Sequence, residues 1–255
     1  MSAFSQGSAL AARAVASPNF GARRGAGVDM IVLHYTGCPS AESALLWMCS
    51  PDSQVSAHYL VEEDGEILQL VDEAARAWHA GVAEWEGQSD VNSRSIGIEI
   101  QNTGPLEGGL PPYPEGQVAA VIALCRDIME RHGIAPFRVV GHSDVAPRRK
   151  ADPGEHFPWD ALGRAGVALW VEPAPLADPG AALGPGCEGE GVAELQRGLR
   201  RAGYGLVASG RYCAETEAVV RAFQRRFRPL RVDGIADAST METLRRVLER
   251  LDPAV

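Results

Sequence analysis

The stretch from residue 171 to residue 186 divides this chain of 255 residues and limits what each side of it can fold into. Its prolines and glycines interrupt any helix or strand, so it reads as a linker of limited flexibility. We therefore predict a domain at 1–170, a linker at 171–186 and a smaller module at 187–255. Because the linker separates the two, we expect each to have a core of its own.

Short apolar runs alternate with helical patterns before the linker. Asp64-Gly65 predicts a hairpin turn between two strand-like runs. Further strands and helices follow from apolar periodicity and from helix-ending signals such as Gly133. The predicted strands are 30–35, 58–62, 66–71, 95–101 and 137–142, and the predicted helices are 41–48, 114–132 and 159–170. This order predicts the α/β class, with a mixed central β-sheet flanked by helices.

The module beyond the linker contains an internal repeat. Residues 210–216 align with residues 234–240 at an offset of 24, and a helical apolar pattern follows each copy. An earlier helical pattern carries Val192, Leu195 and Leu199. The module is therefore predicted to be a small three-helix bundle.

Charge and composition exclude some functions. Residues 1–186 carry a net charge of −11 and residues 187–251 one of +3, so the main domain does not suit nucleic acid as a partner. No apolar run approaches the ~20 residues of a membrane span. The first 16 residues fit a signal peptide poorly, and the odd count of five cysteines favours a reducing compartment. We expect a monomer in the cytoplasm, with the periplasm or cell envelope as the alternative.

Two histidines and one aspartate form a candidate metal site. His34 closes the predicted strand at 30–35, and His142 closes the one at 137–142. Asp152 lies ten residues beyond His142, across a loop, so its carboxylate can converge on the same ion. Two imidazoles and one carboxylate suit Zn²⁺ with an open fourth position, which is typical of a hydrolytic site.

Two charged residues are candidates for catalysis. Glu99 lies in the middle of a strand whose alternating isoleucines are suited to burial, and a carboxylate there is costly unless it is paired, linked to a metal or functional. A salt-bridged structural glutamate is the alternative. Lys150 is the only lysine, beside 23 arginines, and precedes Asp152 by two residues. A compact, titratable cation there indicates catalysis, against a chance surface lysine.

Five blocks in order resemble the zinc-dependent N-acetylmuramoyl-L-alanine amidases, a family related to phage amidases and peptidoglycan recognition proteins. The resemblance covers roughly residues 17–165 and rests on residues 31–36, 56–61, 78–81, 95–99 and 141–154. Residues 187–251 look like the peptidoglycan-binding module often appended to cell-wall hydrolases. That likeness rests on residues 192–199, 219–224 and 232–234.

The resemblance implies cleavage between the lactyl group of muramic acid and L-alanine of the stem peptide, with peptidoglycan or a muropeptide as substrate. The family's ligands for one zinc ion fall on the three candidates above, its acid/base on Glu99 and its catalytic cation on Lys150. Tyr35 and His79 are expected to line the substrate groove, although His79 equally suits a satisfied loop histidine. His58, His132 and His156 are taken as structural.

Two alternative functions remain open. Some relatives recognise muropeptides without a metal, having lost a ligand, whereas all three ligands are present here. A peptidase that cuts inside the stem is another possibility, but no His-Glu-x-x-His motif supports it. The appended module favours the intact wall as substrate, and the poor signal peptide favours a recycled anhydromuropeptide.

Overall fold

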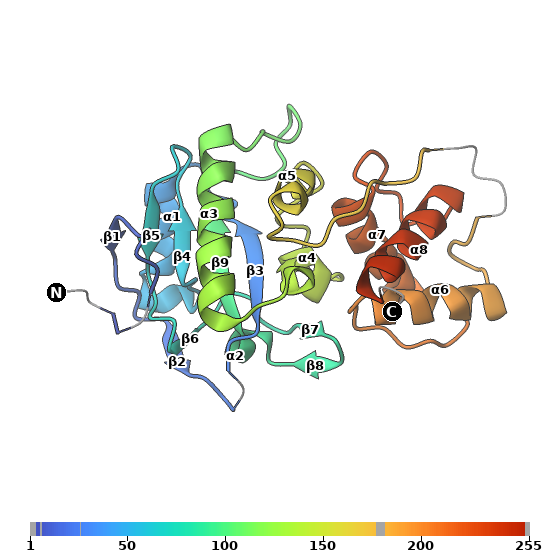
Figure 1. Cartoon of the computed structure of the whole chain (residues 1–255), viewed down its shortest axis with the longest axis horizontal. Coiled ribbons are helices and arrows are strands. Elements are labelled where there is room, and N and C mark those ends of the chain that lie inside the picture. The colour runs from blue at the N-terminus through green and yellow to red at the C-terminus, as the bar shows by residue number, and fades with distance from the viewer. Residues whose placement is uncertain (1–3, 6, 26, 177–181, 253–255) are drawn as a thin grey trace.

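The computed structural model describes residues 4–5, 7–25, 27–176 and 182–252. Its centre is a six-stranded sheet in the order β1-β5-β4-β9-β3-β10, with helices packed on it (Figure 1). All neighbouring strands of this sheet are parallel except the antiparallel pair β4 and β5. The strands are β1 (Arg13–Ala14), β3 (Met30–Tyr35), β4 (Tyr59–Val61), β5 (Ile67–Gln69), β9 (Ser95–Ile100) and β10 (Val139–Gly141). The predicted α/β class and mixed sheet are confirmed.

Two small antiparallel pairs accompany the central sheet. They are β2 (Phe20–Ala22) with β6 (Ala75–Ala77), and β7 (Glu84–Trp85) with β8 (Gln88–Ser89). The helices of this part are α1 (Ala41–Met48), α2 (Val91–Arg94), α3 (Glu115–His132), α4 (His142–Val145) and α5 (Trp159–Arg164), with 3₁₀ turns at η1 (Pro51–Ser53) and η2 (Pro136–Arg138).

Helix α3 covers one face of the sheet and begins and ends as its sequence predicts. Pro114 precedes its first turn, and Gly133 adopts a φ of 67° that stops the helix. Its buried stripe packs against alternate residues of the central strands, which form one apolar cluster. The members of this cluster include Ile31, Leu33, Ile96, Ile98, Val121, Leu124 and Ile128. The other residues of β3 and β9 therefore face the opposite side, where the candidate site lies.

Several predicted elements are shorter than expected, and for two of them the structure shows what ends the element early. The strand predicted at 137–142 ends at Gly141, because the carboxylate of Asp144 accepts the Gly141 N–H at 2.8 Å and starts α4, so His142 opens a helix. The helix predicted at 159–170 ends at Arg164, because Gly166 adopts a φ of 74° and the chain reverses there.

The C-terminal module has the three predicted helices: α6 (Glu190–Arg201), α7 (Ala214–Phe227) and α8 (Ala238–Leu251). Its repeat has a structural meaning. The side-chain oxygen of Gln196 accepts the N–H of Gly210, and that of Gln224 accepts the N–H of Gly234. Each glutamine thus stabilises, by a hydrogen bond, the loop that precedes the following helix.

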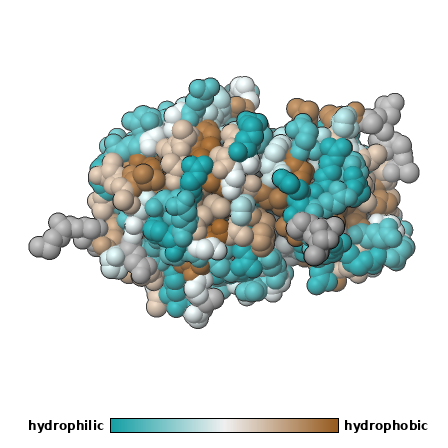
Figure 2. Space-filling model, viewed as in Figure 1, coloured by the Kyte–Doolittle hydropathy of each residue, from teal (hydrophilic) through white to brown (hydrophobic). Residues whose placement is uncertain are grey.

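The two cores are not fully separate: two apolar clusters belong to the main domain alone, but a third is shared with the module. One apolar cluster contains Met30, Val32 and Val140 of the sheet together with Leu195 and Phe223 of the module. The C-terminal module consequently packs against the main body, with α7 in contact with α4 (Figure 1). The space-filling view shows one continuous molecule, with hydrophilic and hydrophobic residues interspersed over the visible face (Figure 2). The described residues of the predicted linker, 171–176 and 182–186, form no helix and only an isolated bridge at Leu183, and residues 177–181 lie outside the described part. The apolar faces of the two parts nevertheless meet and exclude water together.

Candidate metal centre

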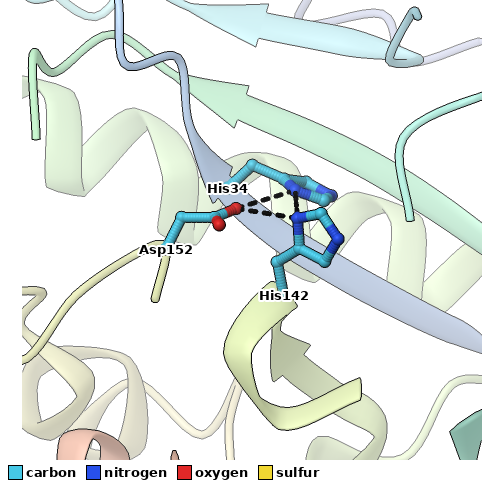
Figure 3. A group of neighbouring side chains, drawn as sticks. All are labelled: His34, His142 and Asp152. Carbon is cyan, nitrogen blue, oxygen red and sulfur yellow. Dashed lines mark hydrogen bonds and ion pairs between the residues drawn. The ribbon is translucent and has the colours of Figure 1, made fainter. Parts of the chain in front are cut away.

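Three side chains from different elements converge beside the sheet. His34 comes from the end of β3, His142 from the first position of α4 and Asp152 from the loop beyond it (Figure 3). All three are buried. A backbone bond of 2.9 Å from the Ser143 N–H to the Asp152 carbonyl holds the loop against α4. The structure therefore brings together the three residues that the sequence proposes as ligands.

The three ligand atoms form a nearly equilateral triangle. His34 Nδ1 lies 2.9 Å from His142 Nδ1 and 3.1 Å from Asp152 Oδ2, and the latter two atoms are 2.9 Å apart. Ligands held about 2.0–2.1 Å from a tetrahedral zinc ion are about 3.3 Å apart. The triangle thus has nearly the size of one face of such a site.

Hydrogen bonding fixes the tautomer of His142. Its Nε2 lies 3.1 Å from the carbonyl oxygen of Ala80, which can only accept, so Nε2 carries the proton. In the neutral ring Nδ1 is then unprotonated and directs its lone pair into the triangle. This is the protonation state that a metal ligand needs.

A chain of hydrogen bonds also fixes the tautomer of His34. The Ser95 hydroxyl donates to the Val91 carbonyl at 2.7 Å and so accepts from His79 Nε2 at 3.0 Å. His79 Nδ1 is thereby left as the acceptor for His34 Nε2, also at 3.0 Å. His34 Nδ1 consequently has no proton and faces the triangle. Two lone-pair nitrogens and a carboxylate oxygen around one point fit a divalent cation well.

The pKa values of both His34 and Asp152 are lowered from their usual values. Burial, together with the neighbouring His142, lowers the pKa of His34 to about 4. Burial alone would raise the pKa of Asp152, but the two imidazoles beside its Oδ2 outweigh burial and hold that pKa well below its usual range. Near neutral pH the triangle therefore combines an anionic carboxylate with a neutral His34 ring.

His79 is nearly buried, with 9% of its surface exposed, and contacts a ligand histidine. It borders the cleft, but its two ring nitrogens are both used by His34 and Ser95, so its hydrogen bonds orient a ligand. A Cβ at Gly97 would lie 2.5 Å from the His79 ring, so only glycine leaves room for it. Sequence reasoning missed Ser95, because nothing in its local pattern shows which histidine it meets.

Glu99 and Lys150 line the same cleft of about 490 Å³ as the triangle. Glu99 is the register partner of His34, and its Oε2 is buried without a hydrogen-bond partner among the described residues. Burial, then the charge of Asp152, raises the pKa of Glu99 well above its usual value, and Lys150 opposes that shift. The partner that a structural, salt-bridged glutamate would have is thus absent from the described part of the chain.

Tyr35 also borders this cleft, as the residue that ends β3. Its ring is partly buried, and burial followed by the charge of Asp152 raises the pKa of its hydroxyl. The three remaining histidines are not part of the triangle: His58 accepts the Gly97 N–H, His132 pairs with Glu73, and the His156 ring stacks on Tyr113. The structure thus places Tyr35 and His79 along the predicted groove.

The fold and this site define a candidate mononuclear metal hydrolase, whose open cleft leads to a carboxylate and an ammonium group. Residues 24–155 match the family model of the N-acetylmuramoyl-L-alanine amidases, and residues 188–244 match that of the peptidoglycan-binding domains. The first match spans more than half of the chain. The chain belongs to the N-acetylmuramoyl-L-alanine amidase family.

Individual relatives support this assignment. The chain is 37% identical to the N-acetylmuramoyl-L-alanine amidase AmiD of Escherichia coli, over 88% of this chain and 83% of the relative. It is 33% identical to the 1,6-anhydro-N-acetylmuramyl-L-alanine amidase AmpD of the same organism, over 60% of this chain and 91% of the relative.

Solved structures give the same result. The complex of E. coli AmiD with anhydro-N-acetylmuramic acid-L-Ala-D-γ-Glu-L-Lys superposes with a TM-score of 0.74 at 36% identity, covering 88% of this chain and 89% of that one. AmpDh3 from Pseudomonas aeruginosa gives a TM-score of 0.72 at 30% identity, covering 94% and 96%. The expected family is confirmed for both parts of the chain. None of the helices that the structure describes is long and apolar enough to cross a membrane.

Proposed function

We propose that this protein hydrolyses the amide bond between the lactyl group of N-acetylmuramic acid and L-alanine, with one zinc ion held by His34, His142 and Asp152. The observation that carries the proposal is the triangle of ligand atoms 2.9–3.1 Å apart, beside which Glu99 and Lys150 line one cleft. The AmiD structure contains anhydro-N-acetylmuramic acid-L-Ala-D-γ-Glu-L-Lys, which supports a muropeptide as substrate.

Each residue of the site has its own task in the proposed reaction. A zinc ion bound there would supply Lewis-acid chemistry, which acidifies water and polarises the scissile carbonyl. Glu99 takes the proton of the attacking water and passes it to the leaving nitrogen of L-alanine, a task that its raised pKa suits. Lys150 directs its ammonium group toward the oxygen that becomes negative as the carbonyl carbon turns tetrahedral. His79 holds the His34 ring, and Tyr35 lines the groove.

The C-terminal module supports a polymeric substrate as well. Its family is described as peptidoglycan binding, and residues 187–251 carry a net charge of +3, in contrast to the negative main domain. We propose that it holds the chain on intact peptidoglycan, while the metal centre also accepts soluble anhydromuropeptides. A monomer in the cytoplasm stays a prediction, which light scattering and fractionation of the native cell test separately.

Digestion followed by mass spectrometry tests the activity. The zinc-loaded protein is incubated with the anhydromuramic tripeptide and, separately, with purified sacculi. The expected products are the free sugar acid and a peptide that begins with L-alanine. Fragments cut within the stem would replace the proposal by a peptidase, and tight binding without cleavage would replace it by a receptor. Treatment with a chelator should abolish the products, and added zinc should restore them.

A further inference from the structure

Asp144 is a buried carboxylate next to the metal centre that is bonded mainly from the C-terminal module. Its Oδ1 accepts the hydroxyl of Tyr204 at 2.8 Å, and its Oδ2 accepts Arg226 Nη1 at 3.0 Å. Asp144 lies two residues after His142, in the single turn of α4. Two side chains from beyond the linker thus reach the helix that carries a metal ligand.

The three groups leave almost no surface to solvent: Asp144 is 1% exposed and Tyr204 2%. The guanidinium of Arg226 is equally buried, stacks 4.6 Å from the ring centre of Trp159 and donates to the Val139 carbonyl at 3.0 Å. Removal of one partner from such a buried pair leaves an uncompensated charge, which is strongly destabilising. Asp144 can therefore change its position only if the packing of the module changes with it.

The helix that these contacts hold is too short to fix its own position. Helix α4 has four residues, and its start depends on the bond from the Gly141 N–H to Asp144 Oδ2. That same oxygen accepts Arg226, so the cap of the helix and the contact to the module share one atom. A shift of the Asp144 carboxylate would tilt the first turn and move the His142 ring out of the triangle.

We propose that Arg226 and Tyr204 of the C-terminal module are positioning residues for the metal ligand His142, acting through Asp144. The module then has a second role besides contact with peptidoglycan: it completes the support of the metal centre. Mutation of residues that orient the ligands without contacting the metal commonly changes metal affinity 10- to 100-fold. This inference rests on the proposed zinc site.

Arg228 offers a matched control. It is 1% exposed, comes directly after α7 and bonds the Thr240 hydroxyl at 2.7 Å, inside the module. Its acidic neighbours Asp233 and Asp237 also belong to the module. Removal of this arginine disturbs the module without touching α4, whereas removal of Arg226 disturbs both.

The test uses full-length protein and measures zinc affinity by competition with a chromophoric chelator, with the melting temperature beside it. Arg226→Met and Asp144→Asn should each weaken zinc binding about 10- to 100-fold, and the double variant should be no weaker than the worse single one. Tyr204→Phe, which deletes one oxygen, should weaken it several-fold. Arg228→Met should lower the melting temperature and leave zinc affinity unchanged.

Hydrogen exchange of the metal-free variants gives a second readout. Amides of residues 142–146 should exchange faster in Arg226→Met than in Arg228→Met. The inference is overturned if Arg226→Met binds zinc as tightly as the wild type, or if Arg228→Met weakens binding equally. If Arg226→Met does not fold, an unchanged affinity in Tyr204→Phe overturns it. A wild-type protein that binds no zinc would instead refute the proposed function.

Discussion

His34 and Glu99 are register partners on the adjacent parallel strands β3 and β9. Residues paired in this way project from the same face of a sheet, so the metal ligand and the carboxylate share one cleft. The opposite residues of the two strands pack under α3. One strand pairing therefore sets both the core and the geometry of the reaction.

Glu99→Gln should retain the fold and zinc but lose most of its turnover. Glutamine keeps the shape of the side chain and cannot carry the proton, and general acid–base catalysis contributes about 10²- to 10⁴-fold. Release of L-alanyl peptide by the variant, measured with bound zinc per chain, checks this. Glu63→Gln on the surface is the control. A turnover within a few-fold of the wild type would return Glu99 to a structural role.

Lys150→Arg should lower kcat about 10²- to 10³-fold, with zinc content and melting temperature nearly unchanged. The broad planar guanidinium places its donors elsewhere than a compact ammonium does, and loss of one oxyanion donor has about this effect. Arg148→Lys, at an exposed neighbour, should keep full activity. If the arginine variant is fully active, positive charge of either kind beside Asp152 is sufficient.

Ser95→Ala should weaken zinc binding about 10-fold or more, because hydrogen bonds that orient the ligands without touching the metal change metal affinity to that extent. Without the hydroxyl, His79 Nε2 loses its acceptor and the ring can take the other tautomer, which leaves His34 Nε2 facing a donor. Ser56→Ala is the control, since the hydroxyl of this buried serine bonds, among the described residues, to Asn19 and Trp78 and to no histidine. Equal zinc affinity in both variants would show that the relay does not fix the His34 tautomer.

His58 should make the metal-free protein less stable in acid. Burial, with the Arg23 guanidinium as the second cause, lowers the pKa of His58 to about 3, whereas the unfolded chain has about 6.5. Below pH 6.5 His58 is protonated in the unfolded chain but stays neutral in the folded one. The free energy of unfolding therefore falls as the pH is lowered to about 3, by about 1.4 kcal/mol per pH unit.

Urea unfolding at pH 7 and pH 5 measures this loss. His58→Gln should lose about 2 kcal/mol less than the wild type between those two values, with metal removed from both proteins. The comparison at each pH cancels the contribution of the other acids and bases. An identical pH dependence in the two proteins would mean that His58 takes up its proton at the same pH in the folded and the unfolded chain.

The sequence predicts local elements well because their causes are local. Pro114 and Gly133 mark the ends of α3, and alternation in β9 places Glu99 opposite the isoleucines. Contacts between residues that are far apart in the sequence have no such local signal. Leu195 and Phe223 show the same helical spacing whether they face their own bundle or the neighbouring sheet, and for this reason the shared core was not predicted.

The candidate ligands follow from residue type and strand ends, whereas their support does not. His34 and His142 each follow an apolar run, and the loop returns Asp152 to them. That Asp144 is bonded by Arg226 and Tyr204 depends on the docking of the module, which no spacing in the sequence encodes.

Removal of residues 171–255 should yield a poorly soluble protein that binds zinc weakly, which reverses the expectation of two independent cores. The truncation uncovers apolar side chains such as Val140 and Trp85 that pack in the shared cluster, and it leaves the Asp144 carboxylate without Arg226.

Cleavage of the linker tests whether the peptide chain or the noncovalent contact holds the two parts together. A protease site placed within residues 171–186 of the full chain should be cleaved without dissociation, because the shared apolar cluster and the Asp144–Arg226 pair still join the two parts. The nicked protein should elute at the size of the intact chain and retain zinc, and it should separate only in denaturant. If the fragments separate in buffer and the N-terminal one stays soluble with its zinc, the two cores are independent after all.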